Sequence, residues 1–192
     1  MRASRAGVRC GILPHAFPSR LIAACDNLHM NTRVSATAAV LAGLALILFP
    51  LLGLAAKLVY PGWMLVIAIW FGWLLLPGYI IQIVVAANGL LRRNGVLRRA
   101  RGAWRTITAA WVTSAGILGV GLFLIDGGDD GRSESAMTVL LGMTDSPDAK
   151  ELSTILALIF GFLWLAGWAY LVIEWIVQLV LARNARRAGR AA

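Results

Sequence analysis

Histidine and cysteine are almost absent from this chain, which has two of each among its 192 residues. All four of them (His15, His29, Cys10 and Cys25) lie within the first 29 positions. The rest of the chain therefore has no thiolate for a redox, zinc or iron–sulfur site, no imidazole for a haem, and no histidine for a catalytic dyad. We accordingly predict a protein that has no metal and no cofactor and is not an enzyme.

Charged residues are also scarce. They make up 14% of the chain against 59% hydrophobic residues, whereas a soluble domain is about a quarter charged. The hydrophobic residues are gathered in long runs, which excludes a soluble fold, a disordered chain and a small disulfide-bonded module. Crossing a hydrocarbon core of about 30 Å takes about 20 apolar residues, and four runs reach that length. They cover residues 36–56, 63–87, 106–125 and 152–181.

These runs are expected to be helices, because backbone polar groups in lipid must find their partners within the same segment. Pro50 and Pro77 are compatible with this, since membrane helices tolerate kinks. Ser146 and Pro147 suit the N-cap and the first position of the fourth helix. The predicted fold is an all-α integral membrane protein, a helical bundle of four transmembrane helices.

Basic residues are concentrated in three segments that four spans would place on one side of the membrane. Fifteen of the 18 lie before the first span, between the second and third spans, or after the fourth. The positive-inside rule then puts both termini in the cytoplasm. Sixteen of the 18 are arginine, a bias typical of GC-rich bacterial genomes. We therefore expect a multi-pass protein of the bacterial plasma (inner) membrane.

Three regions are expected along the chain. Residues 1–33 form a disordered basic cytoplasmic tail, with Met30 as an alternative start of translation. Residues 34–183 form the four-helix membrane domain, and residues 184–192 form a second basic cytoplasmic tail. Within the membrane domain, the outer loop 126–151 holds seven acidic residues. Its spacing matches a calcium-binding EF-hand loop only in part, so we expect a solvated acidic loop without a metal.

The net charge of +9 does not indicate nucleic-acid binding, because the arginines flank apolar spans. At such positions, anionic lipid headgroups account for them. The link between the second and third spans holds six arginines: Arg92, Arg93, Arg98, Arg99, Arg101 and Arg105. We predict that these residues contact lipid headgroups.

Glu174 is the one ionisable residue deep within a predicted span. A carboxylate at this depth costs at least a few kcal/mol, so it should face the interior of the bundle. Gln178 lies one helical turn further on and shares that face. In the second span, Pro77 has no amide hydrogen, which leaves the carbonyl of Trp73 without its helical donor.

These features predict an intramembrane polar cluster between the second and fourth spans. In it, protonated Glu174 donates to the Trp73 carbonyl, Gly78 gives room for the approach, and Gln82 and Gln178 complete the hydrogen bonds. The favoured interpretation is that the cluster holds helices together, since such bonds are typically worth about 0.6 kcal/mol and at most 1–2. The alternative is a proton or ion pathway.

Three classes of function remain, and the third, a lipid-modifying enzyme, lacks the clustered Asp, His or Ser that it would need at one interface. The first is a small polytopic membrane protein that serves as a structural, interaction or assembly component of the plasma membrane. Its partner would be a second copy of the chain or another membrane protein. The alternative is a small transporter or proton-coupled carrier that uses Glu174 and Gln178.

Overall fold

The computed structural model describes residues 35–59, 61–99, 102–128 and 132–191. The predicted tail 1–33, the alternative start at Met30, and Arg101 lie outside the described residues. Four helices are long and apolar enough to cross a membrane, which confirms the predicted helical membrane class. They are Ala36–Ala56, Gly72–Leu91, Ala103–Phe123 and Pro147–Gly189.

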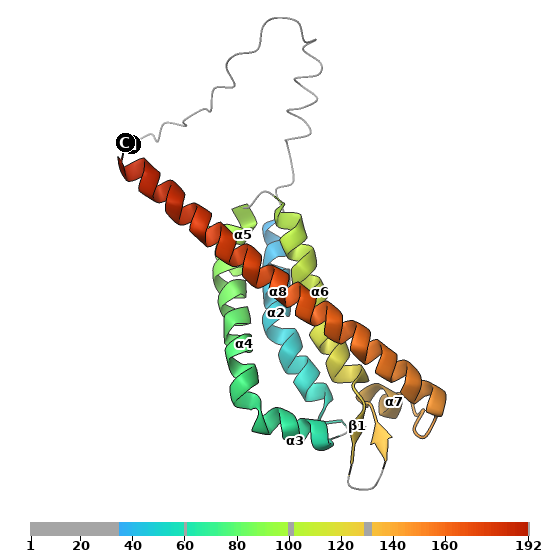
Figure 1. Cartoon of the computed structure of the whole chain (residues 1–192). Helices are drawn as coiled ribbons and strands as arrows, with labels where there is room; N and C mark the ends of the chain where they lie inside the picture. The colour runs from blue at the N-terminus through green and yellow to red at the C-terminus, as the bar shows by residue number, and fades with distance from the viewer. Residues whose placement is uncertain (1–34, 60, 100–101, 129–131, 192) are drawn as a thin grey trace, which may run out of the picture. The chain divides into compact units, whose positions relative to one another are not determined.

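The described part of the chain is almost entirely helical (Figure 1). In chain order the elements are α2 (Ala36–Ala56), α3 (Trp63–Trp70), α4 (Gly72–Val85), the π-helix η1 (Ala86–Leu91), α5 (Val96–Arg99), α6 (Ala103–Phe123), β1 (Asp126–Gly127), β2 (Ser133–Glu134), α7 (Ala136–Leu140) and α8 (Pro147–Ala191). The two short strands pair in antiparallel fashion.

The second predicted span is not one helix. The structure divides residues 63–87 into α3, α4 and the start of η1, with a break at Phe71. Figure 1 shows α3 turned sharply away from the axis of α4. A carboxylate oxygen of Asp126 accepts a hydrogen bond from the Met64 amide at 2.7 Å. This bond holds the first turn of α3 beside β1, a contact that an apolar run cannot reveal.

Helix α6 packs against α2 and against α8. Glycines allow these helices to approach closely, because a side chain would collide with the neighbouring backbone. A Cβ on Gly116 would lie 2.7 Å from the Trp164 amide nitrogen of α8. A Cβ on Gly121 would likewise meet the backbone of Gly53 in α2. Close approach of this kind, through small residues, is how helices associate in a membrane.

Helix α8 is longer than any membrane span requires. It has 45 residues, which corresponds to a length of about 67 Å at 1.5 Å per residue. Its start confirms the predicted cap, since helix α8 begins at Pro147 and the Ala149 amide donates to the Ser146 hydroxyl at 3.4 Å. Its end lies beyond the predicted span 152–181, because residues 184–191 of the predicted basic tail continue the helix.

The membrane domain has two ends, which are named here the basic end and the hairpin end and which consist of different helices and strands. The basic end consists of η1, α5, the start of α6 and the last third of α8. Here Leu90 and Leu97 are fully buried, so the link between the second and third spans contributes to the core. The buried apolar core comprises Ala42, Leu46, Val85, Ala86, Leu90, Leu97, Ala110 and Leu171.

The hairpin end consists of α3, β1, β2, α7 and the start of α8. Helix α7 begins with a capping box, in which Ser135 and Thr138 each bond the other's backbone amide. The helix ends at Leu140, and Gly142, two residues further on, has a left-handed φ of 67°. The Met143 amide bonds the Thr138 carbonyl and the Gly142 amide bonds the Val139 carbonyl, which closes the helix in a Schellman motif.

Candidate functional site

A buried hydrogen bond joins α4 to α2 within the membrane-spanning helices. Gln82 is 4% exposed, and its amide nitrogen donates to the Leu46 carbonyl at 2.7 Å. Leu46 lies four residues before Pro50, which has no amide hydrogen to donate to that carbonyl. Gln82 therefore supplies the hydrogen bond that Pro50 cannot make. One turn earlier in α4, the Tyr79 hydroxyl donates to the next carbonyl, that of Ile47, at 2.8 Å.

Glu174 and Gln178 pair with each other within α8. The Gln178 amide nitrogen donates to a Glu174 carboxylate oxygen at 2.9 Å. Both side chains are half-buried. The predicted proximity of these two residues on one helical face is therefore present in the structure.

The predicted cluster of five residues, in which Trp73 and Gly78 join Glu174, Gln178 and Gln82, is not assembled, and this corrects the prediction. Trp73 is 70% exposed, and a Cβ on Gly78 would have no atom within 4 Å. The cause is the geometry of α4. Its first half, next to the break at Phe71, stands apart from the other helices, and only its second half, with Gln82, reaches α2.

The arginines of the link between η1 and α6 differ in exposure. Arg92, Arg93 and Arg105 are exposed, whereas Arg98 is half-buried. The Arg105 guanidinium lies 5.7 Å from the ring centroid of Trp104, within the range of a cation–π contact. The side chain of Arg99 and all of Arg101 lie outside the described residues. Contact of these arginines with lipid headgroups stays a prediction.

The hairpin end contains buried charges that the sequence analysis missed. Asp126 is 1% exposed and Lys57 is 7% exposed. The Lys57 ammonium donates to the Leu124 carbonyl, and Asp126 caps α3 through the Met64 amide. Burial lowers the pKa of Lys57, and the nearby Asp126 carboxylate offsets part of that effect. In the sequence, the only indication of this buried lysine is its position directly after an apolar run.

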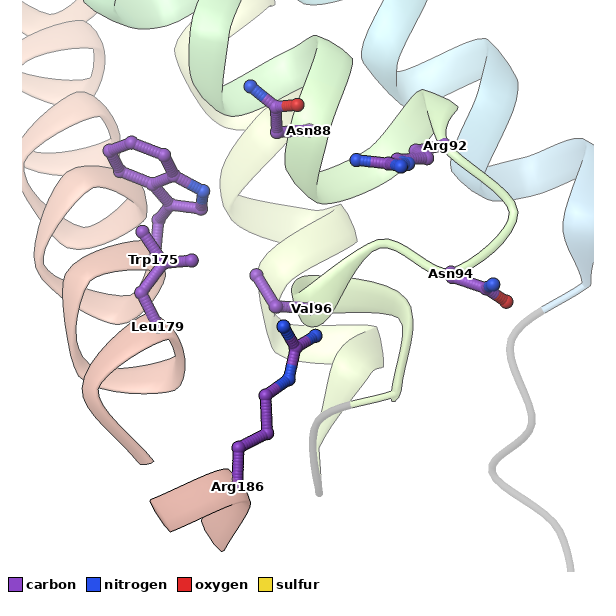
Figure 2. Close-up of a pocket in the computed structure, with 7 residues that line it drawn as sticks. All are labelled: Asn88, Arg92, Asn94, Val96, Trp175, Leu179 and Arg186. Carbon is purple, nitrogen blue, oxygen red and sulfur yellow. The ribbon is translucent and has the colours of Figure 1, made fainter. Parts of the chain in front are cut away.

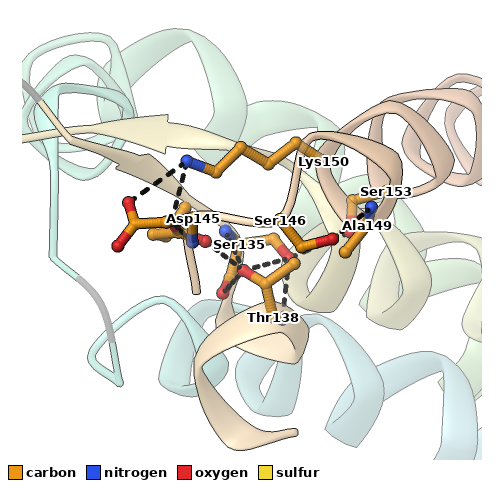
Figure 3. Close-up of polar contacts among 8 residues, drawn as sticks. Ser135, Thr138, Asp145, Ser146, Ala149, Lys150 and Ser153 are labelled. Atoms are coloured by element: carbon orange, nitrogen blue, oxygen red, sulfur yellow. Dashed lines mark hydrogen bonds and ion pairs between the residues drawn. The ribbon is translucent and has the colours of Figure 1, made fainter. Parts of the chain in front are cut away.

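Glu134 is the centre of a second buried polar group, and its partners Thr138, Asp145 and Lys150 are labelled in Figure 3. It is 2% exposed. One of its carboxylate oxygens lies 2.9 Å from the Lys150 ammonium and accepts from the Asp145 amide, also at 2.9 Å. The other oxygen accepts from the Thr138 hydroxyl at 2.7 Å.

These contacts set the charge of Glu134. Burial alone would raise its pKa. The Asp145 amide, the Lys150 ammonium and the Thr138 hydroxyl outweigh that effect, so the pKa lies below its ordinary value. The predicted solvated acidic loop is therefore wrong for Asp126 and Glu134, which are structural partners inside the hairpin end.

Among the residues that the structure describes, no group of three or more His, Cys, Asp or Glu side chains is placed to hold a metal ion. The polar contacts above join helices or fix loops. Comparison of the chain with models of protein families, with curated proteins and with solved structures gave no match. The function therefore has to be inferred from the residues themselves.

Proposed function

We propose that the protein is a small interaction or assembly component of a bacterial plasma membrane, with both termini in the cytoplasm. The segregation of 15 of 18 basic residues supports this orientation. The interaction is placed on the first half of α4, residues 72–78. This half-helix is the first part of the membrane-spanning helix Gly72–Leu91 and contributes little to its packing against the other helices.

The observation that carries the proposal is the exposure of four consecutive residues. Trp73, Leu74, Leu75 and Leu76 are 70%, 60%, 51% and 55% exposed. Successive residues in a helix are about 100° apart, so these four cover most of its circumference. A helix that packs within its own chain has a buried face, and this segment has none.

The segment also has features that suit another transmembrane helix. The sites of Gly72 and Gly78 are open, with no atom within 4 Å of a Cβ at either position. Small residues of this kind allow a second backbone to approach closely. Pro77 leaves the Trp73 carbonyl without its helical donor. The partner is therefore a transmembrane helix that carries a hydrogen-bond donor, such as Ser, Thr, Asn or Gln, opposite Trp73.

Cysteine crosslinking in native membranes tests this proposal. In a background with Cys10→Ser and Cys25→Ser, a single Leu75→Cys variant carries a photocrosslinker. A Leu158→Cys variant, on a 71% exposed position of α8, is the matched control. We expect a discrete crosslinked product from position 75 and none from position 158. Mass spectrometry of the product then distinguishes a second copy from a different protein. Equal yields at both positions would contradict a specific interface.

The transporter alternative makes a different prediction at Glu174. If the residue holds structure, Glu174→Gln keeps an acceptor oxygen for Gln178 and preserves folding, whereas Glu174→Leu loosens the helices. If it carries protons, Gln is as damaging as Leu to substrate-dependent flux in reconstituted vesicles. Such flux, abolished by Glu174→Gln, would favour a carrier over an assembly component.

A further inference from the structure

A pocket of about 440 Å³ opens at the basic end, between α8 on one side and η1 with α5 on the other. Figure 2 shows the residues that line it. Five of the seven have side chains that can donate hydrogen bonds: Asn88, Arg92, Asn94, Trp175 and Arg186. None of the lining residues is acidic. The wall is therefore cationic and rich in donors.

The two arginines come from different helices. Arg92 directly follows η1, and Arg186 lies in the part of α8 that was expected to be a tail. In Figure 2 both side chains extend toward the space between the two walls, with the Arg186 guanidinium beside Val96. Two guanidinium groups on one cavity form a good site for a phosphate, because each can donate two parallel hydrogen bonds to its oxygens.

Trp175 gives the pocket an unused donor. It lines the wall on α8, and its indole nitrogen is buried without a hydrogen-bond partner. Figure 2 shows that nitrogen on the edge of the ring that faces η1. A buried donor without a partner destabilises the fold. Because the nitrogen is buried in the present arrangement, a phosphate oxygen in the pocket would satisfy it once the indole ring turns toward the cavity.

The backbone at this wall is unusual as well. η1 is a π-helix, closed at its end by a bond from the Arg92 amide to the Ala87 carbonyl, five residues back, at 3.1 Å. Such wide turns are rare and occur frequently at functional sites. Here the wide turn carries Asn88 and ends at Arg92.

From these observations we propose that the pocket binds a phosphate monoester or inorganic phosphate, held by Arg92, Arg186 and Asn88 and by the indole N–H of Trp175. The phosphate belongs either to an anionic lipid headgroup or to a free anion. Val96 and Leu179, which also line the pocket, offer apolar surface beside the charges. This suits a headgroup, whose acyl chains lie next to it. The proposal does not depend on the interaction assigned to α4.

Calorimetric titration of the full chain in a sugar-headgroup detergent tests the site, at about 0.15 M salt to screen diffuse attraction. The probes are dihexanoyl phosphatidic acid and inorganic phosphate, with dihexanoyl phosphatidylcholine as the control. We expect saturable binding of at least one phosphate probe and none of the control. Binding of the lipid alone identifies a headgroup site, and binding of both probes identifies a site for phosphate itself. If neither saturates, the proposal is wrong.

The chain supplies a matched control for charge. Arg93 and Arg187 stand directly beside Arg92 and Arg186 but do not line the pocket. The pair of substitutions R92A/R186A therefore removes the same charge as R93A/R187A. Hydrogen bonds to charged groups are about twice as strong as those between neutral groups, so we expect R92A/R186A to weaken binding at least about tenfold. R93A/R187A should stay within about twofold of the unmodified chain. If the two pairs of substitutions weaken phosphate binding equally, the binding is a general electrostatic attraction and the proposed site is wrong.

Trp175→Phe provides an independent test that does not change the charge. It keeps an aromatic ring and removes only the N–H donor, with an expected loss of about threefold in affinity. Helicity and elution volume show whether each variant is folded. If R92A/R186A fails to fold, Trp175→Phe becomes the test of the phosphate site. Unchanged affinity in that variant refutes the proposal.

Discussion

Replacing Gln82 with leucine should destabilise the membrane domain by an amount that depends on Pro50. Gln82 donates to the Leu46 carbonyl at 2.7 Å in a site that is 4% exposed. Leucine keeps most of the volume but leaves that carbonyl without any donor. Hydrogen bonds between membrane helices average about 0.6 kcal/mol and reach about 1.7. Since the abandoned carbonyl is buried, we expect a loss near the upper limit, about 1–2 kcal/mol.

The second half of the experiment changes Pro50 to alanine. Alanine has an amide hydrogen, which restores the ordinary helical bond to Leu46. In the Pro50→Ala background, Gln82→Leu should therefore cost less than about 0.5 kcal/mol. The four proteins form a double-mutant cycle, measured by reversible unfolding in mixed micelles with dodecyl sulfate and followed by circular dichroism.

Tyr79→Phe is the internal control for this cycle. The Ile47 carbonyl that accepts from Tyr79 also faces the amide of Leu51, four residues on, so it keeps a partner when the hydroxyl is removed. We expect a loss of no more than about 0.6 kcal/mol, unchanged by Pro50→Ala. If Gln82→Leu costs the same with and without Pro50, the explanation of Gln82 as a replacement donor is refuted.

Two further predictions concern the hairpin end and the packing of the helices. Because the pKa of Glu134 is lowered by folding, its contribution to stability is present above the ordinary glutamate pKa of about 4.3 and is lost as the pH falls through the lower folded value. Glu134→Gln should therefore lower the free energy of unfolding by about 1–3 kcal/mol at pH 7, and by less in acid. Thermal unfolding at neutral and at acidic pH measures both losses. A loss that is the same at the two pH values would contradict this prediction. Gly116→Ala places a Cβ 2.7 Å from the Trp164 amide nitrogen and should cost about 1–3 kcal/mol through overpacking. Gly78→Ala, at a site with no atom within 4 Å, should change stability by less than about 0.5 kcal/mol in the same unfolding assay. If Gly116→Ala and Gly78→Ala lower stability by similar amounts, the close packing of α6 on α8 is contradicted.

Much of the helical framework is determined by the sequence alone. The first predicted span, residues 36–56, coincides with α2, and Ser146 with Pro147 begins α8 as expected. Both results follow from local properties: the length of an apolar run, a capping hydroxyl, and a proline that suits the first helical turn. Each of these acts within a few residues along the chain, so no knowledge of the neighbouring helices is needed.

The sequence also shows which backbone carbonyls lack a helical donor. It does not show which side chain replaces that donor. A proline inside a helix leaves the carbonyl four residues earlier without a donor. This holds at Pro50 as well as at Pro77. The sequence analysis applied the rule to Pro77 and assigned Glu174 as the donor. The structure satisfies the other carbonyl, at Leu46, with Gln82, because only the second half of α4 lies against α2.

Tertiary structure alone decided which polar groups meet. Asp126 and Glu134 had the appearance of solvated loop acids, yet the first caps α3 and the second binds Lys150. The pocket at the basic end likewise joins Arg92 to Arg186 across nearly a hundred residues. The length of an apolar run depends only on residues that are neighbours in the sequence, so it can be read along the chain. A hydrogen bond depends on the position and direction of two groups, which are fixed only once the helices have packed.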